Sequence, residues 1–189
     1  MPHRDKNITL PLDMSLAPRV IFFFGMSGAG KSYVGDIIGA FNKDSYVYHA
    51  DEDITDEMKN ALAKKLPFTD KMRNAFFKII TQKIRELIKQ HEQVIITQGA
   101  YKQKHREYLA REIPGIELVW VDASQDIIHQ RLMQRAEGIS IESADALVKD
   151  FEEPPTLTKS IINTRDGNFI IEQLNYYYSD HKDYLRKIG

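Results

Sequence analysis

The segment Gly25-Met26-Ser27-Gly28-Ala29-Gly30-Lys31-Ser32 decides the fold, because it is a complete G-x-x-x-x-G-K-S motif. The apolar run RVIFFF (19–24) precedes it, and a helical pattern follows over residues 31–41. In such a strand–loop–helix unit, backbone N–H groups and the positive end of the helix dipole surround a polyphosphate. Glycines allow the backbone to approach the phosphates closely. We therefore expect this segment to bind a nucleotide.

The residue types in the motif predict individual roles. Lys31 is expected to reach the β- and γ-phosphates and to act in catalysis, and the hydroxyl of Ser32 is expected to bind Mg²⁺. A nucleotide and Mg²⁺ are therefore the expected ligands of this segment. The predicted nucleotide-binding residues of this segment are Gly25, Ser27, Gly28, Ala29, Gly30, Lys31, Ser32 and Tyr33. The sequence contains no guanine-reading N-K-x-D motif and is short for a motor domain, which argues against a regulatory GTPase or an ATPase motor.

Composition limits the other classes of function. The chain has 189 residues, which fits one domain, and a net charge of −1, which gives no general attraction to nucleic acid or anionic membranes. It has no cysteine, and no apolar run approaches the ~20 residues that span a bilayer. We expect a flexible N-terminal extension over residues 1–17, a phosphate-loop domain over residues 18–189, and a cytoplasmic location.

Strand-like and helix-like segments alternate along the chain. Strands are expected at residues 19–24, 46–50, 93–97, 116–121 and 160–163. Helices are expected at residues 31–41, 54–65, 70–90, 102–111, 124–135, 143–151 and 168–186. This alternation predicts a three-layer α/β protein with a five-stranded parallel sheet. Because the phosphate-loop motif follows the first strand, the expected fold class is the three-layer P-loop NTPase fold.

Acidic residues directly follow the second expected strand, as Asp51-Glu52-Asp53. In open parallel sheets, ligands collect at the carboxyl ends of the strands. We expect Asp51 to contribute to Mg²⁺ binding, and Asp53 to bind the acceptor substrate and to orient or deprotonate its attacking hydroxyl. The alternative is a structural one, in which these acids cap the next helix and interact with its dipole.

Basic residues near the strand ends are candidates for substrate binding. Arg73 follows a proline-containing turn, and Lys102 and Arg106 lie one helical turn apart and so share a helix face. Such cations suit an anionic substrate, because a guanidinium group binds a carboxylate through two hydrogen bonds. The alternative for each is a solvated surface charge, which is the commoner fate of Lys and Arg.

Two further arginines, Arg131 and Arg135, are four residues apart on one expected helix, before the segment AEGIS (136–140). We interpret residues 136–141 as the tip of a lid. Arginines on a lid can close over the phosphates and neutralise charge in the transition state. Both are therefore predicted to bind the nucleotide, with Arg135 also catalytic, and the alternative is an exposed helix face.

Together these segments resemble the gluconokinase family of small P-loop kinases. FFFGMSGAGKS (22–32) looks like the family's phosphate loop, YHADED (48–53) like its acidic motif, and TQGAYKQKHREYL (97–109) like its Ser-Ala-Leu-Lys segment. The resemblance runs from about Val20 to Pro154. It implies a sheet order of 2-3-1-4-5, a helical lid, Mg-ATP as donor, gluconate or a similar sugar acid as acceptor, and a homodimer.

The segments that differ from the family are mostly those that would recognise the acceptor. Asp56-Glu57 stands where the family has His-Pro, Met72 replaces an Asp, and Phe76 replaces a Trp. Gly99 stands for a serine, and Gly138-Ile139-Ser140 for Gly-His-Phe. Phosphoryl transfer is therefore predicted more firmly than the identity of the acceptor.

Two alternatives stay open. A shikimate kinase has the same layout and an acidic pair after the second strand, although its Gly-Gly-Gly is absent from this chain; other metabolite, nucleotide or antibiotic phosphotransferases have a similar size. The second alternative is a nucleotide-binding module without turnover. The acidic pair Asp51 and Asp53 argues against it, because a binding module has no need of these residues.

Overall fold

The computed structural model describes residues 7–64, 66–134 and 148–180. Five parallel strands form one sheet in the order β2-β3-β1-β4-β5, which confirms the predicted fold class and strand order. The strands are β1 (Val20–Phe24), β2 (Ser45–His49), β3 (Gln93–Thr97), β4 (Ile116–Asp122) and β5 (Ser160–Ile162). All five run in the same direction, so their carboxyl ends meet at one edge of the sheet.

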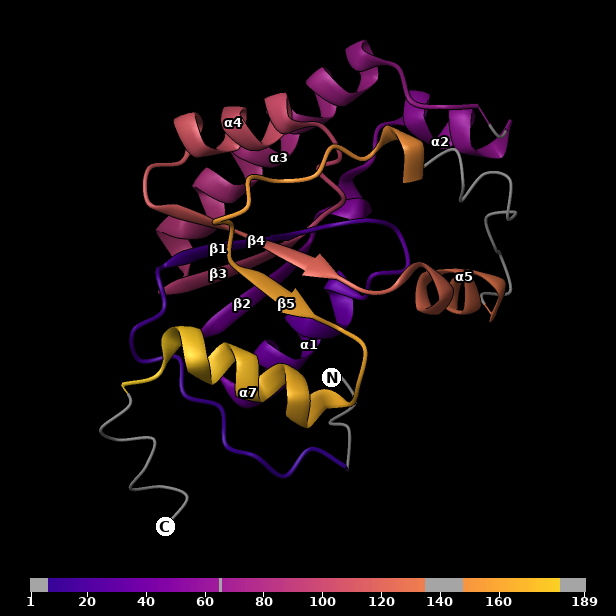
Figure 1. Ribbon diagram of the computed structural model, residues 1–189. Helices are drawn as coiled ribbons and strands as arrows, with labels where there is room; N and C mark the ends of the chain where they lie inside the picture. The colour runs from indigo at the N-terminus through magenta and orange to yellow at the C-terminus, as the bar shows by residue number, and fades with distance from the viewer. Residues whose placement is uncertain (1–6, 65, 135–147, 181–189) are drawn as a thin grey trace.

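Helices cover both faces of the sheet (Figure 1). The helices are α1 (Lys31–Phe41), α2 (Asp56–Ala63), α3 (Asp70–Gln90), α4 (Gln103–Glu112), α5 (Gln125–Gln134) and α7 (Gly167–Tyr178). In β1, Ile21 and Phe23 pack with α1 and α7, and the alternate residues pack against α3 and α4. This arrangement explains why β1 is apolar at every position: both of its faces are buried.

The helix predictions differ from the structure at two places. Residues 50–53 form a 3-10 turn, and α2 begins only at Asp56, where the side chain of Thr55 caps it by accepting from the N–H of Met58. Helix α7 ends at Tyr178 because Ser179 is extended, so it does not reach residue 186. Most of the expected helix 143–151, and the expected lid tip at 136–141, lie outside the described residues.

Residues 7–17, the described part of the expected N-terminal extension, pack along α7. The amide of Asn175 donates to the carbonyl oxygen of Pro11 and accepts from the N–H of Asp13, and Asn168 accepts from two further backbone N–H groups. Alternate apolar side chains of the segment contact the core: Ile8, Leu10, Leu12 and Met14. This period of two was visible in the sequence, and it is typical of an extended segment with one buried face.

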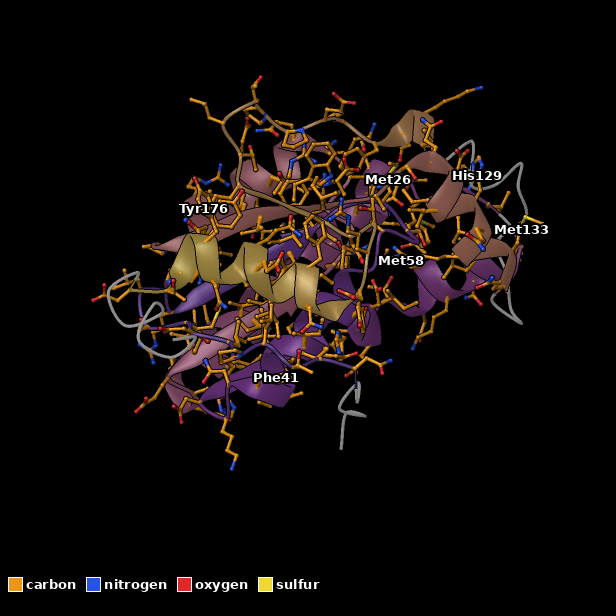
Figure 2. The ribbon with its side chains drawn as sticks, turned by 60° about the horizontal axis from the view of Figure 1, so that its bottom comes forward. Met26, Phe41, Met58, His129, Met133 and Tyr176 are labelled. Carbon is orange, nitrogen blue, oxygen red and sulfur yellow. The ribbon has the colours of Figure 1, made fainter. Side chains whose placement is uncertain are left out.

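Side chains at the outer ends of the helices point to solvent. Met133 near the end of α5 and Tyr176 on α7 are about two-thirds exposed, and Figure 2 shows both on the outside of the molecule.

Over the described residues, no helix combines the length and the apolar character that crossing a bilayer requires.

Candidate active site

The phosphate loop leaves the carboxyl end of β1 and enters α1, as its sequence predicts. Gly25 and Gly30 have φ angles of 153° and 91°, which side chains disfavour. A Cβ atom on Gly25 would lie 2.2 Å from the carbonyl oxygen of Val121, and one on Gly30 would lie 2.0 Å from Nδ2 of Asn163. Both glycines are therefore required by the close approach of β4 and of the residue that follows β5.

Lys31 and Ser32 occupy the first turn of α1, where the helix leaves backbone N–H groups available. The ammonium group of Lys31 donates to the carbonyl oxygen of Met26 at 2.9 Å, so the side chain curls back over the loop (Met26 is labelled in Figure 2). Lys31 is only 9% exposed, whereas Ser32 is exposed. The loop thus combines the buried ammonium group of Lys31 with the exposed hydroxyl of Ser32, as a polyphosphate site requires.

Two side chains, Arg131 and Asn163, donate hydrogen bonds to backbone carbonyl oxygens of the phosphate loop. Arg131 donates through Nη1 to the carbonyl oxygens of Gly28 and Ala29, both at 3.3 Å, and through Nη2 to Asn163. The buried Asn163 donates from Nδ2 to the carbonyl oxygen of Ala29 at 2.8 Å. The structure therefore places Arg131 against the loop backbone, and its predicted contact with nucleotide remains a prediction.

Asn163 is not among the site residues predicted from the sequence. A usable signal existed, because Asn163 follows β5 directly, and Asp51 lies two residues beyond the end of β2. A polar residue at the carboxyl end of a parallel strand has a raised chance of lying at the ligand-binding edge.

The acidic pair lies in the 3-10 turn after β2. Asp53 accepts a hydrogen bond of 2.5 Å from the hydroxyl of Tyr48, and the exposed Asp51 accepts one of 3.4 Å from Nε2 of Gln98. Burial, together with this hydrogen bond to Asp53, raises the pKa of the Tyr48 hydroxyl. Tyr48 consequently remains a neutral donor, and it fixes the orientation of the Asp53 carboxylate.

The loop after β3 joins the acidic turn to the phosphate loop. Gln98 contacts Asp51, the carbonyl oxygen of Gly99 accepts from the N–H of Gly25 at 3.2 Å, and the hydroxyl of Tyr101 accepts from the N–H of Ser27 at 2.7 Å. The predicted phosphate and acidic sites are therefore brought together at one edge of the sheet.

The chemistry of this edge fits a magnesium ion that arrives with a nucleotide. Ser32 and Asp51 offer a hydroxyl and a carboxylate, both exposed, and oxygen atoms are the ligands that Mg²⁺ prefers. Within the described ranges, no group of three or more acidic or histidine side chains could hold a metal alone. An ion at these residues would therefore depend on phosphate oxygens and water for its other ligands.

Arg73 and Lys102, which are predicted to bind the substrate, both pair with the carboxylate of Asp150. Asp150 is not among the site residues predicted from the sequence. Asp150 pairs with Arg73 at 2.5 Å and with Lys102 at 2.7 Å, and Glu152 lies 3.5 Å from the Lys102 ammonium group. We call these four residues the Asp150 cluster. The hydrogen bond to Asp150 raises the pKa of Lys102. Burial opposes ionisation of Asp150, but its bonds to the two cations outweigh burial and lower its pKa.

Arg106 is buried, at 2% exposed, and its guanidinium group is engaged within the protein. It donates to the carbonyl oxygens of Ala100, Tyr101 and Glu152 and to the side chain of Gln103. The expected cationic face shared by Lys102 and Arg106 is therefore not formed. The structure instead gives Arg106 the role of fixing the loop after β3 to the segment around residue 152. Arg135 lies outside the described residues.

Comparisons with known proteins agree with this geometry. A family model described as an AAA domain matches residues 20–154. The chain is 27% identical over 117 residues to a shikimate kinase from Prochlorococcus marinus, covering 62% of this chain and 59% of that protein. It is 28% identical over 129 residues to a gluconokinase from Gluconobacter oxydans, covering 66% of this chain and 69% of that protein. The match thus spans less than two thirds of the shikimate kinase's length.

A solved structure shows the same fold over nearly the whole chain. The gluconokinase from Sinorhizobium meliloti 1021 has a TM-score of 0.71 at 20% identity, covering 89% of this chain and 97% of that one. The sheet order, the phosphate loop and the acidic turn together define a P-loop protein with the architecture of the small kinases. The chain belongs to the AAA-domain family of P-loop proteins, and the curated relatives that it matches are small-molecule kinases.

Proposed function

We propose that the protein is an ATP-dependent phosphotransferase that transfers the γ-phosphoryl group to a hydroxyl of a small metabolite, gluconate or a related sugar acid. One observation carries the proposal: the loop after β3 links the phosphate loop to the Asp51–Asp53 turn through direct hydrogen bonds. A protein that only binds ATP has no need of two carboxylates beside the terminal phosphates.

In the proposed reaction, the acceptor oxygen forms a bond to the γ-phosphorus atom, and the bond from that phosphorus to the ADP oxygen breaks. Asp53 holds the acceptor hydroxyl and receives its proton, with Tyr48 keeping the carboxylate in place. Lys31 and the loop N–H groups stabilise the charge on the phosphates. When bound, Mg²⁺ would neutralise phosphate charge, and Ser32 and Asp51 are the residues that would hold it.

The preference for a carboxylate-bearing acceptor rests on the Asp150 cluster and on the relatives. Arg73 and Lys102 are side chains that bind carboxylates, and they are only 12% and 22% exposed. Gluconate and shikimate, named in the two curated relatives, are both hydroxylated carboxylates. Such an acceptor would replace Asp150 as the partner of these cations while it places a hydroxyl near Asp53.

The test is ADP release by the purified protein with Mg-ATP and a panel of acceptors: gluconate, related sugar acids, shikimate, nucleoside monophosphates and no acceptor. We expect a carboxylate-bearing polyol to raise the rate well above the rate without acceptor. Stimulation only by a nucleotide would overturn the acceptor class but keep phosphoryl transfer. ATP binding without stimulation by an extended panel of hydroxylated metabolites would favour the non-catalytic module.

A further inference from the structure

The loop Gln98–Lys102 is held more rigidly than an ordinary connection. Its Ala100 has a φ of 41°, the only positive φ of a non-glycine residue in the described part of the chain. Side-chain Oε1 of Gln98 accepts from the N–H of Ala100 at 2.7 Å, and Arg106 donates to the carbonyl oxygens of Ala100 and Tyr101. Strained backbone that is fixed by several contacts is typical of functional positions. Here its effect is to set the direction of the Tyr101 side chain.

The hydroxyl of Tyr101 reaches the phosphate loop. It accepts a hydrogen bond of 2.7 Å from the N–H of Ser27, one of the backbone donors that such a loop directs at phosphates. The oxygen of Tyr101 therefore lies within one hydrogen bond of the phosphate-binding surface. Residue 101 was not among the site residues predicted from the sequence.

The same hydroxyl has a hydrogen left to donate. A tyrosine hydroxyl is both an acceptor and a donor, and its bond to Ser27 uses only the acceptor function. Among the described residues no acceptor for this hydrogen is found. Burial raises the pKa of the Tyr101 hydroxyl, so the group keeps its proton at neutral pH. A bound phosphate oxygen would supply the missing acceptor.

The surroundings of Tyr101 indicate which phosphate this would be. The Arg73 guanidinium lies 6.0 Å from the centre of the Tyr101 ring, and Phe151 packs edge-on against the ring at 5.5 Å. Tyr101 thus stands between the phosphate loop and the Asp150 cluster, which is the proposed acceptor side. The phosphate that faces the acceptor is the terminal one of a nucleoside triphosphate.

We infer that Tyr101 is a phosphate-binding residue, whose hydroxyl accepts from Ser27 and donates to the terminal phosphoryl group of the nucleoside triphosphate. The inference deepens the proposed function and rests on it. It adds one side-chain donor to the cradle of backbone N–H groups, on the side from which the acceptor approaches. Its consequence is a preference for the triphosphate over the diphosphate that the loop backbone alone does not give.

The test compares binding of ADP and of the non-hydrolysable β,γ-imido analogue of ATP, both with Mg²⁺, by calorimetry. The variant Tyr101→Phe removes only the hydroxyl, and Tyr108→Phe in α4 is the matched control, since its ring packs against Arg111 instead of the site. We expect Tyr101→Phe to weaken binding of the triphosphate analogue about ten- to a hundredfold, the loss of one hydrogen bond to a charged group. Binding of ADP should change less than about twofold on the same reasoning.

The other outcomes separate this inference from the proposed function. Unchanged or tighter binding of the triphosphate analogue to Tyr101→Phe would overturn the inference, since the hydroxyl would then be neutral or a competitor for the Ser27 N–H. An equal loss for ADP and the analogue would reduce Tyr101 to a structural support of the loop. If the wild-type protein bound neither nucleotide, the proposed function itself would fail.

Discussion

The phosphate loop and the Asp150 cluster lie on the same edge of the sheet, but they are built from different contacts. The loop is shaped by glycines and braced by hydrogen bonds from Arg131 and Asn163 to backbone carbonyl oxygens. The cluster consists of ion pairs between side chains that are 12% to 49% exposed. The backbone shape of the loop tolerates substitution of most side chains. In an ion-pair cluster, by contrast, the substitution of any one member changes the charge and the contacts of the others. On the proposed function, the fold would set the donor chemistry, and a few side chains would set the choice of acceptor.

The largest effect is expected in the phosphate loop. Lys31→Ala removes the ammonium group that should stabilise the transferring phosphates, and we expect kcat/KM to fall about a thousandfold. Acceptor-stimulated ADP release measures it. Lys59→Ala, in the exposed pair with Asp56, is the control and should leave the rate unchanged. A Lys31 variant with a rate near wild type would show that the loop does not carry the chemistry.

A second large effect is expected at Asp53, in the acidic turn after β2. In Asp53→Asn the amide oxygen can still accept from the Tyr48 hydroxyl, but the group can no longer take a proton from the acceptor. We expect transfer to fall at least about a hundredfold, with ATP affinity unchanged. Asp56→Asn, at a side chain that is 94% exposed, is the matched control. Loss of ATP affinity together with turnover would instead assign Asp53 to nucleotide binding.

A substitution in the Asp150 cluster should instead lower the KM for the acceptor. Asp150→Asn removes the carboxylate that occupies Arg73 and Lys102, so a carboxylate-bearing acceptor no longer competes with it. We expect the KM for that acceptor to fall roughly two- to fivefold, the scale of a partly exposed ion pair, with the KM for ATP unchanged. Asp70→Asn, which breaks an exposed pair with Lys104, is the control. A raised acceptor KM would mean that Asp150 itself binds the acceptor's hydroxyls.

The smallest effect concerns α4, which supports the Asp150 cluster. His105 stacks on Phe77, and burial lowers its pKa from 6.5 to about 4. Between these values the unfolded chain binds more protons than the folded protein, so the free energy of unfolding should decrease as pH falls from 6.5 towards 4. Denaturant titrations of wild type and His105→Gln measure it. The variant should have the flatter profile; identical profiles for the wild type and the variant would contradict the prediction.

The same contrast explains what could be predicted from the sequence. The phosphate loop, the five strands and the acidic turn were found because each depends on neighbours along the chain. Asp150 was missed because its partner Arg73 lies 77 residues away. Arg106 is predicted to share a substrate-binding face with Lys102 because their spacing matches one side of a helix, yet the carbonyl oxygen of Glu152, 46 residues away, helps to hold its guanidinium inside. Spacing shows which residues share an element, but packing decides which way a long side chain points.

The proposal as a whole depends most directly on where the terminal phosphate of ATP goes. We would incubate the protein with Mg-ATP labelled in the γ-phosphoryl group and with gluconate, shikimate or a related sugar acid, and then separate phosphate esters from inorganic phosphate. We expect the label in an ester of one of these acceptors, and its loss in Asp53→Asn. Label found only in inorganic phosphate, or remaining in ATP that is demonstrably bound, would contradict the assignment of phosphoryl transfer to this site.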